Sequence, residues 1–247
     1  MPIKSGLRQY LFPTRRKESE PAAAYDIWSL TYDQQPDNLM LALDDQLCTS
    51  MLEKLGVEDR VIADIGCGTG RHWKKILDRG PAQLLGFDVS AGMLEILRQK
   101  YPKAKTWLIH DERLPLEKGS VDLALSTLTI AHIPNLPAAL DEWSRIIRPG
   151  GDLLITDYHP AALAKGGQRT FRDKGQVIAI RNHVYPLRQV CEEAAKAGLA
   201  TVSITERKID DSMRPYYEKA QALPVFRRFR GVPIIYGLHL KKSDAVI

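Results

Sequence analysis

The sequence has few cysteines, and no two of them lie close together along the chain. Cys48, Cys67 and Cys191 are the only three in 247 residues, and no CxxC motif joins any two. This argues against a disulfide framework and a zinc ribbon, because both need closely spaced cysteines. No apolar run approaches the roughly 20 residues of a membrane span. The segment from Met1 to Tyr10 also lacks the apolar core of a signal peptide. We therefore expect reduced thiols, no membrane span and a cytoplasmic protein.

A large excess of one charge is also missing. The chain has 35 Lys and Arg against 30 Asp and Glu, a net charge of +5, and much of the excess lies in Arg15-Arg16-Lys17 and Arg227-Arg228-Phe229-Arg230. Such short runs are commonly solvated faces, which we prefer to a nucleic-acid-binding stripe. Hydrophobic residues make up 44% and charged residues 26%. This composition and length predict one packed domain with modest additions.

The order of hydrophobic segments predicts an α/β fold. From Val61 onward, short β-branched or leucine-rich runs alternate with helical periodicity, which is typical of a parallel sheet with helices on both faces. The expected strands are Val61–Ile65, Gln83–Asp88, Thr106–His110, Val121–Ser126 and Asp152–Asp157, with helices beginning near Arg71, Ser90, Leu136 and Leu187. We expect Pro149-Gly150-Gly151 to end the Leu136 helix and start the next strand. Two later segments, Ala200–Arg207 and Val232–Leu240, would add an antiparallel edge and complete a doubly wound sheet of seven strands.

Two further segments are expected to cover this core. Before Val61 lies a helical stretch with Tyr25, Trp28 and Tyr32, followed by an amphipathic helix from Leu39 to Leu55. We assign residues 1–56 to an N-terminal helical lid and residues 57–247 to the core. Residues 159–186 are rich in Gly, Lys and Arg. They are expected to form a long loop that caps the strand ends, since long loops in compact domains are usually functional or mobile.

A glycine-rich turn after the first core strand predicts a ligand site. In Asp64-Ile-Gly-Cys-Gly-Thr-Gly70 the glycines occupy every second position. Glycine lets a ligand approach the backbone, and the helix that follows offers amide donors and a positive dipole end. Asp64 would be costly at the end of a buried strand unless it served a partner. The dinucleotide motif GxGxxG fits poorly, because Arg71 stands at its third glycine.

The next strand also ends in an acid. Asp88 is placed where a carboxylate can accept hydrogen bonds from two ribose hydroxyls. Ser90 is expected to cap the following helix at its N-terminus. The two turns together predict a ligand with an anionic or zwitterionic part and a ribose.

These motifs resemble those of the class I S-adenosylmethionine-dependent methyltransferases. The acid and alternate glycines resemble motif I of that family, and His110-Asp111-Glu-Arg-Leu-Pro115 resembles its acidic segment. The stretch from Ser120 to Ile133, followed by Ile146-Ile-Arg-Pro-Gly-Gly151, is similar to the ubiquinone-biosynthesis-type (methyltransferase type 11) branch. Tyr25 to Asp33 is similar to the tyrosine-bearing start of that branch. The motifs follow the family's order from Tyr25 to Asp157, and beyond His159 the match is looser.

The resemblance implies a Rossmann-like fold that binds S-adenosylmethionine and releases S-adenosylhomocysteine, with no metal. Asp88 would meet the ribose, Met93 the adenine ring and Asp111 the adenine amino group; His110 departs from the family's usual small residue. Cys67 would matter through its backbone. The full implied cofactor set is Tyr32, Asp64, Gly66, Cys67, Gly68, Gly70, Asp88, Val89, Met93, Asp111, Glu112, Arg113 and Ser126. For a metal, the nearest acids, Asp141-Glu142, have no histidine at ligand spacing.

Two histidines are the candidate catalytic groups. His132 follows the fourth strand at the edge where open α/β sheets bind ligands, and His183 lies in a segment similar to a histidine-bearing one of the branch. Either could act as a base, worth roughly 10²–10⁴-fold, or could orient the substrate. Each also has an interpretation as a structural histidine. His159, after the fifth strand, is placed similarly.

The expected acceptor is small or lipid-like, and the sequence does not choose between O-, N- and C-methylation. Nucleic-acid bases are disfavoured, because Ser126-Thr-Leu-Thr129 replaces the Asn/Asp-Pro-Pro-aromatic turn of the enzymes that methylate them. A nucleic-acid or protein methyltransferase and a catalytically silent binding subunit stay as alternatives. The sequence does not tell whether the chain is a monomer or a homodimer.

Overall fold

The core of the molecule is a sheet of seven strands. The computed structural model describes residues 17–167 and 169–244. The strands are β2 (Val61–Ile65), β3 (Gln83–Asp88), β4 (Lys105–Leu108), β5 (Val121–Thr127), β6 (Ile147–Tyr158), β9 (Leu199–Lys208) and β10 (Pro233–Lys242), in the order β4-β3-β2-β5-β6-β10-β9. β2 to β6 run parallel, and β10 lies antiparallel between β6 and β9. The expected mostly parallel sheet with an antiparallel edge is confirmed.

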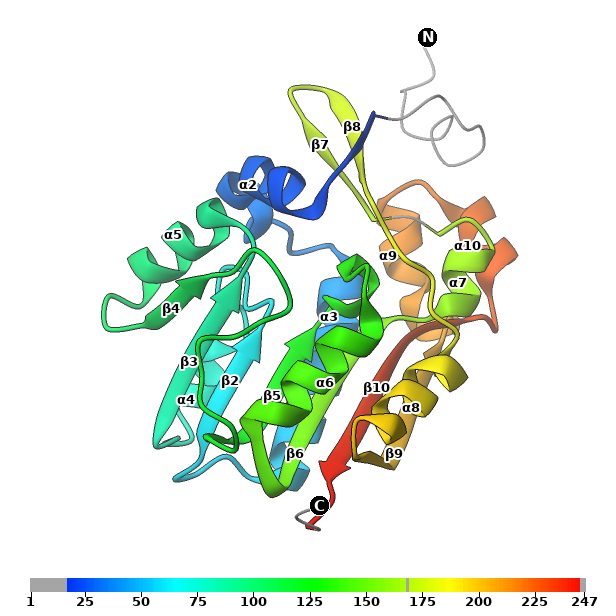
Figure 1. Ribbon diagram of the computed structural model, residues 1–247. Coiled ribbons are helices and arrows are strands. Elements are labelled where there is room, and N and C mark those ends of the chain that lie inside the picture. Colours follow the sequence, from blue (N-terminus) through cyan, green and yellow to red (C-terminus); the bar gives the residue numbers. More distant parts are fainter. Residues whose placement is uncertain (1–16, 168, 245–247) are drawn as a thin grey trace, which may run out of the picture.

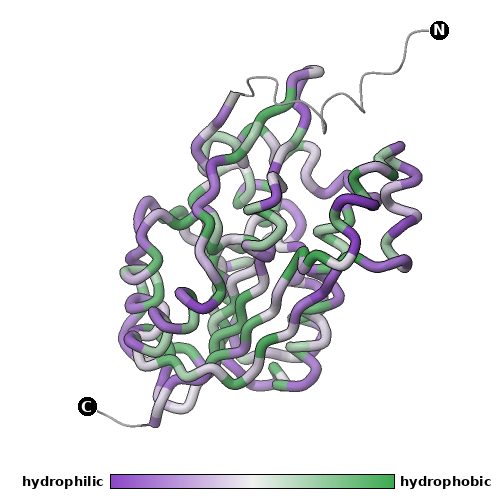
Figure 2. Tube along the Cα trace, turned by 90° about the vertical axis from the view of Figure 1, so that its right-hand side faces the viewer, coloured by the Kyte–Doolittle hydropathy of each residue, from purple (hydrophilic) through white to green (hydrophobic). Residues whose placement is uncertain are grey.

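Helices cover both faces of this sheet (Figure 1). One face carries α3 (Leu39–Leu55), α4 (Trp73–Leu77) and α5 (Ala91–Lys100), and the other carries α6 (Leu136–Ile146) and α8 (Leu187–Lys196). Alternate residues of β2 point to opposite faces, so Ile62 joins one hydrophobic cluster and Ala63 joins the other. The fold is therefore the expected doubly wound one. Figure 2 shows hydrophobic residues gathered along the central strands.

The helix termini follow the capping residues of the sequence. Ser90 Oγ accepts a hydrogen bond from the Met93 N–H and caps α5, as predicted. Asn38 caps α3 in the same way. The expected boundary at Pro149-Gly150-Gly151 is wrong: α6 ends at Ile146 and β6 already begins at Ile147. A register shift between β5 and β6 follows Val121 and accommodates the extra residues.

A second, three-stranded sheet lies over the carboxyl ends of the core strands (Figure 1). It has the order β1 (Lys17–Ser19), β8 (Gln176–Ile180), β7 (Thr170–Asp173) and packs on α2 (Pro21–Tyr32). Trp28 of α2 stacks on Phe171 of β7 with ring centroids 4.8 Å apart. The expectation of a long loop over residues 159–186 is therefore wrong, because α7 (Pro160–Ala164) and the β7–β8 hairpin are ordered there. We call β1, α2, β7 and β8 the cap.

A helical insertion between β9 and β10 completes the molecule. It holds η2 (Asp211–Met213), α9 (Arg214–Lys219) and α10 (Leu223–Phe229), about which the sequence analysis made no prediction. Phe226 and Phe229 pack with Met40 of α3 in a third hydrophobic cluster. Within the described residues, no helix is both long and apolar enough to cross a bilayer. Residues 1–16 of the expected lid, with Arg15 and Arg16, lie outside the described residues.

Candidate active site

The glycine turn adopts a backbone that side chains would disfavour. Gly66, Gly68 and Gly70 have φ of 74°, 53° and 74°, in the left-handed region. A Cβ on Gly66 would lie 2.2 Å from Thr129 Oγ1, whereas a Cβ on Gly68 would meet no atom within 4 Å. Gly66 thus permits close packing against the β5 end, and Gly68 exposes its backbone to open space.

Asp88 ties this turn to the end of β3. Its Oδ2 accepts a hydrogen bond from the Gly68 N–H at 2.7 Å, and Oδ1 accepts one from the Ser90 N–H at 2.8 Å. Burial raises the pKa of Asp88 to about 6, although these backbone bonds oppose the rise. Each carboxylate oxygen can accept a second bond, so Asp88 retains capacity for two hydroxyl donors.

Asp64 lies beneath the turn. Its Oδ2 accepts the Trp73 Nε1–H at 2.9 Å, while Oδ1 has no hydrogen-bond partner among the described residues. Burial raises the pKa of Asp64 to about 7. The side chain is only 2% exposed, so its place is that of a buried support.

A cavity of about 280 Å³ opens at the carboxyl ends of β2, β3 and β5, and we call it the inner cavity. Eight predicted cofactor residues line it: Tyr32, Gly66, Gly68, Asp88, Val89, Met93, Asp111 and Glu112. The other five, Asp64, Cys67, Gly70, Arg113 and Ser126, are outside its lining. Cys67 packs in the hydrophobic cluster with Trp73, and Ser126 is fully buried. The inner cavity suits a nucleoside: it offers the Asp88 carboxylate, the open backbone at Gly68 and the buried Met93 side chain.

Helix α2 is held beside the inner cavity at its middle and just after its end. In its middle, Asp26 Oδ1 accepts hydrogen bonds from Ser90 Oγ at 2.6 Å and from the Gly92 N–H at 2.9 Å. Just after its end, Asp33 Oδ1 accepts the Thr69 hydroxyl at 2.7 Å. These contacts hold α2 to the glycine turn and to the start of α5.

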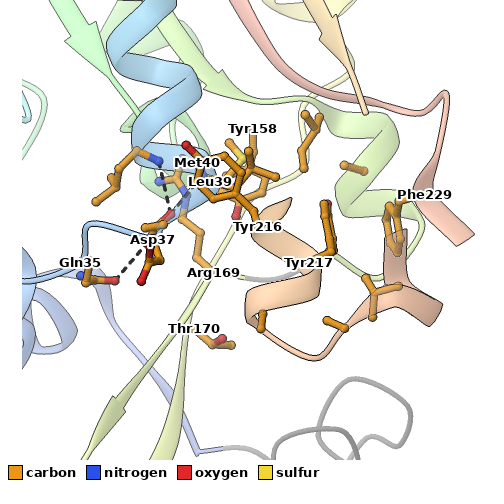
Figure 3. A pocket seen from close by; sticks show the side chains of 18 of the residues that line it. Gln35, Asp37, Leu39, Met40, Tyr158, Arg169, Thr170, Tyr216, Tyr217 and Phe229 are labelled. Carbon is orange, nitrogen blue, oxygen red and sulfur yellow. Dashed lines mark hydrogen bonds between the residues drawn. The ribbon is translucent and has the colours of Figure 1, made fainter. Parts of the chain in front are cut away.

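A second cavity, of about 700 Å³, lies between the cap and the α9–α10 insertion, and we call it the outer cavity. Figure 3 shows Arg169 entering it between the α2–α3 connection, which carries Asp37, and α9, which carries Tyr216 and Tyr217. The inner and outer cavities share three lining residues: Tyr25, Tyr32 and Leu128. These three residues therefore lie at the boundary between the two cavities, and we call this boundary the junction.

His132 lines the inner cavity at the junction. Its Nδ1 lies 2.9 Å from the Arg181 carbonyl oxygen, which can only accept, so Nδ1 carries the proton. Its Nε2 then accepts hydrogen bonds from the Tyr25 hydroxyl at 3.0 Å and from Arg169 Nη1 at 2.6 Å. Burial, and then the Arg169 charge, lower the pKa of His132 to about 3. The ring is therefore neutral at ordinary pH.

Arg169, which the sequence analysis missed, is the centre of this network. It is 6% exposed, forms an ion pair with the fully buried Asp157 and donates to the Leu128 carbonyl. Its guanidinium carbon lies 5.1 Å from the centroid of the Tyr158 ring. Burial alone would lower its pKa, but Asp157 raises it above the ordinary value. Only the abundance of Arg in residues 159–186 pointed to this position.

The other two candidate histidines lie away from the junction. The His183 N–H donates to the Ala131 carbonyl at 2.7 Å, and its ring stacks on Tyr185. His183 is absent from the described lining of both cavities. His159 caps α7 and pairs with Glu206 at 2.6 Å. Over residues 17–167 and 169–244, no group of three or more His, Cys, Asp or Glu could hold a metal ion.

Comparison with known proteins agrees with the fold. The methyltransferase-domain family matches residues 63–155. The chain is 37% identical over 120 residues to the malonyl-[acyl-carrier protein] O-methyltransferase of Yersinia pestis, covering 47% of this chain and 43% of that protein. It is 27% identical over 165 residues to the ubiquinone/menaquinone biosynthesis C-methyltransferase UbiE of Campylobacter jejuni, covering 63% and 66%.

Similarity also extends to a larger protein and to solved structures. The chain is 30% identical over 165 residues to the biotin biosynthesis bifunctional protein BioHC of Cellvibrio japonicus. The match covers 66% of this chain but only 32% of that protein, so the chain spans about a third of its length. An S-adenosylmethionine-dependent methyltransferase from Mesorhizobium loti superposes with a TM-score of 0.62 at 19% identity, over 78% of this chain and 96% of that one. At this identity the superposition shows the fold alone.

The fold, the glycine turn and these relatives define the class of the protein, the class I S-adenosylmethionine-dependent methyltransferases, which are enzymes. Within this class the matched domain and the UbiE relatives identify the branch. The chain belongs to the type 11, ubiquinone-biosynthesis-type methyltransferases.

Proposed function

We propose that this chain transfers a methyl group from S-adenosylmethionine to a small or lipid-like acceptor. The donor would bind in the inner cavity and the acceptor in the outer cavity. The observation that carries the proposal is that the two cavities share Tyr25, Tyr32 and Leu128, so that they are neighbours separated by no more than these side chains. The relatives' named acceptors, malonyl groups on a carrier protein and quinones, are small or lipid-like as well.

The chain's own residues would bind and align the donor. Asp88 would accept the ribose hydroxyls, and the open backbone at Gly68 would face the amino-acid part. Met93 and Asp111 line the inner cavity and would contact the adenine. The donor supplies an activated methyl group, so the remaining work is alignment and the exclusion of water. Helix α2, fastened through Asp26 and Asp33, would keep water out.

The histidines would act by position. His132 contacts both Tyr25 and Arg169 at the junction. Of its two candidate roles, a base or a group that orients the substrate, these contacts favour the second. Its Nε2 lone pair is occupied by two donors, so proton removal would require both to leave. His183 lies behind Ala131, and a role for it would act through the His132 segment.

Calorimetry with S-adenosylhomocysteine tests the donor site. We expect binding to the full chain, and Asp88→Ala should weaken it tenfold or more, because charge-assisted hydrogen bonds to the ribose are lost. The matched control is Asp78→Ala, which removes an exposed carboxylate on the same half of the sheet. Absence of binding to the unaltered chain would refute the proposal and would favour a catalytically silent fold.

A further inference from the structure

The junction of the two cavities holds a buried cation. Arg169 lines the outer cavity, and its Nη1 contacts the Leu128 carbonyl and His132 Nε2, which both belong to residues that line the inner cavity. A group bound to Arg169 would therefore lie beside the boundary between the two cavities.

The hydrogen-bond acceptors nearest Arg169 are each engaged with a donor. His132 Nε2 accepts from Tyr25 and Arg169. Asp157 Oδ1 accepts from Arg169 and from the Tyr158 N–H, and its Oδ2 accepts the Ala131 N–H at 2.8 Å. Burial also raises the pKa of the Tyr25 hydroxyl above its ordinary value. A proton from the acceptor would have to compete with these donors.

Four further carboxylates line the cavities. In the outer cavity, Asp37 is paired with Lys219 at 2.6 Å. In the inner cavity, Asp88 accepts two backbone N–H groups, Asp111 accepts the N–H of Arg113, and Glu112 lies beside Asp111. These three acids belong to the donor side of the site. An acceptor that is already ionised needs none of these groups as a base.

The chemistry of Arg169 selects the kind of ion. A guanidinium has five N–H donors in a planar fork that matches a carboxylate. Nη1 serves the Leu128 carbonyl and His132, Nη2 serves Asp157, and Tyr25 is a further hydrogen-bond neighbour of the side chain. The edge formed by Nε and Nη2 is the part of the fork that could turn to a ligand in the outer cavity. A carboxylate can accept from both atoms of this edge.

The rest of the outer cavity indicates what the carboxylate is attached to. Apolar side chains form much of its wall, among them Met40, Val225, Phe229 and Ile234. The charged lining consists of Lys165, Arg169 and Arg228 against the single acid Asp37. A cavity of about 700 Å³ with this lining fits an apolar chain that ends in an acid.

We propose that the acceptor is a carboxylic acid with an apolar chain, that Arg169 binds its carboxylate, and that the methyl group is transferred to a carboxylate oxygen. This inference rests on the proposed methyltransferase function. The oxygen forms a bond to the methyl carbon while the sulfur–carbon bond breaks, and the electron pair of that bond stays on sulfur. The products are a methyl ester and S-adenosylhomocysteine, and no proton needs to be removed. His132 is then a positioning residue for Arg169.

Binding of octanoate to the protein loaded with S-adenosylhomocysteine tests the inference without turnover. Octanol serves as the matched neutral ligand of the same chain. We expect octanoate to bind tenfold or more tightly than octanol, because only the acid forms charge-assisted bonds to Arg169. Equal binding of the two, or no binding of octanoate, would overturn the inference.

The variant must remove the cation without leaving a buried charge. Arg169→Gln alone would strand Asp157, which is destabilising. We therefore combine Arg169→Gln with Asp157→Asn, and use Arg188→Gln on the exposed face of α8 as the control. The preference for octanoate should vanish in the double variant and persist in Arg188→Gln. Thermal melting and S-adenosylhomocysteine binding report whether the double variant is folded. If it is not, Arg169→Lys is used instead. This variant keeps the charge but loses the planar fork, so it should bind octanoate with a smaller preference over octanol. A preference that survives in the folded variant contradicts the assignment.

Product analysis separates this inference from the proposed function. With a deuterated methyl donor, mass spectrometry should find label in methyl octanoate, and alkaline hydrolysis should release it as methanol. Label in an octanol or octylamine product, but not in the ester, would leave the methyltransferase function intact and refute the carboxylate acceptor. Failure to bind S-adenosylhomocysteine would instead refute the proposed function itself.

Discussion

At the scale of single residues, Asp88 should make donor binding depend on pH. Its pKa is raised to about 6. At the proposed donor site, the charged form is the one that would accept two ribose hydroxyls. The affinity for S-adenosylhomocysteine should therefore fall by about tenfold as the pH is lowered from about 8 to about 5. Calorimetry across this range measures it. Asp88→Asn should bind weakly but with a flat profile, and an equally steep profile in that variant would show that another group titrates.

Asp64 should make the ligand-free protein less stable as the pH rises. Its pKa is raised from 3.8 to about 7 on folding, so between these values the folded state holds a proton that the unfolded state has lost. Stability is thus lost as the pH increases through that window. The side chain of Asp64→Asn does not titrate. The free energy of unfolding of the variant minus that of the wild type should therefore increase by on the order of a few kcal/mol between about pH 4 and about pH 7. Urea unfolding of both proteins decides this; parallel pH curves would contradict it.

The sequence predicted the place of single residues in the fold where a local motif required them. Gly66 and Gly68 belong to a turn whose backbone needs glycine, Asp88 ends the next strand, and all three line the inner cavity. Their contact with a methyl donor stays a prediction. Arg169 and Asp157 could not be predicted in this way. Their pairing depends on the cap lying over β6, which is a tertiary contact between segments with no motif. Whether Ser126, Arg113 and His183 serve the reaction stays a prediction.

At the scale of elements, helix α2 should govern donor affinity. Asp26→Asn removes the charge from the contacts with Ser90 and Gly92 that hold α2 on the start of α5. We expect S-adenosylhomocysteine to bind between about threefold and tenfold more weakly, because part of the ligand's binding energy must then hold the helix in place. The control is Glu95→Gln, an exposed change on α5 itself. Unchanged calorimetric affinity in Asp26→Asn would show that α2 is held by its hydrophobic face alone.

The elements with strong hydrophobic patterns were predicted, and the ones built by pairing were not. The core strands bury apolar runs on both faces, so the sequence predicted β2, β3 and β5 as strands. β1 is the polar stretch Lys17–Ser19, and it is a strand only because β8 lies beside it. The β7–β8 hairpin did carry a signal, since Lys174-Gly175 separates two short runs and both residues adopt positive φ. The abundance of Gly, Lys and Arg around it obscured this signal.

At the scale of the whole molecule, the cap and the core should differ in local stability. The hydrophobic cluster under the cap contains five buried residues of the cap and Met93 of α5, whereas the cluster under α6 and α8 contains 22. The amides of α2 and the β7–β8 hairpin should therefore exchange hydrogen faster than those of β2, β5 and β6. S-adenosylhomocysteine should slow exchange in the cap and change the core little. Equal exchange of the cap with and without ligand would count against its role as a lid.

The shared position of α2 has a consequence for how acceptor preference could diverge or be engineered. Tyr25 and Tyr32 line both cavities, so at the proposed sites a substitution there should alter donor and acceptor recognition together. Tyr216, Tyr217 and Phe229 of the insertion between β9 and β10 line the outer cavity only. A library confined to that insertion could change the acceptor while leaving the affinity for the methyl donor intact, which makes residues 211–231 the independently variable module of this enzyme.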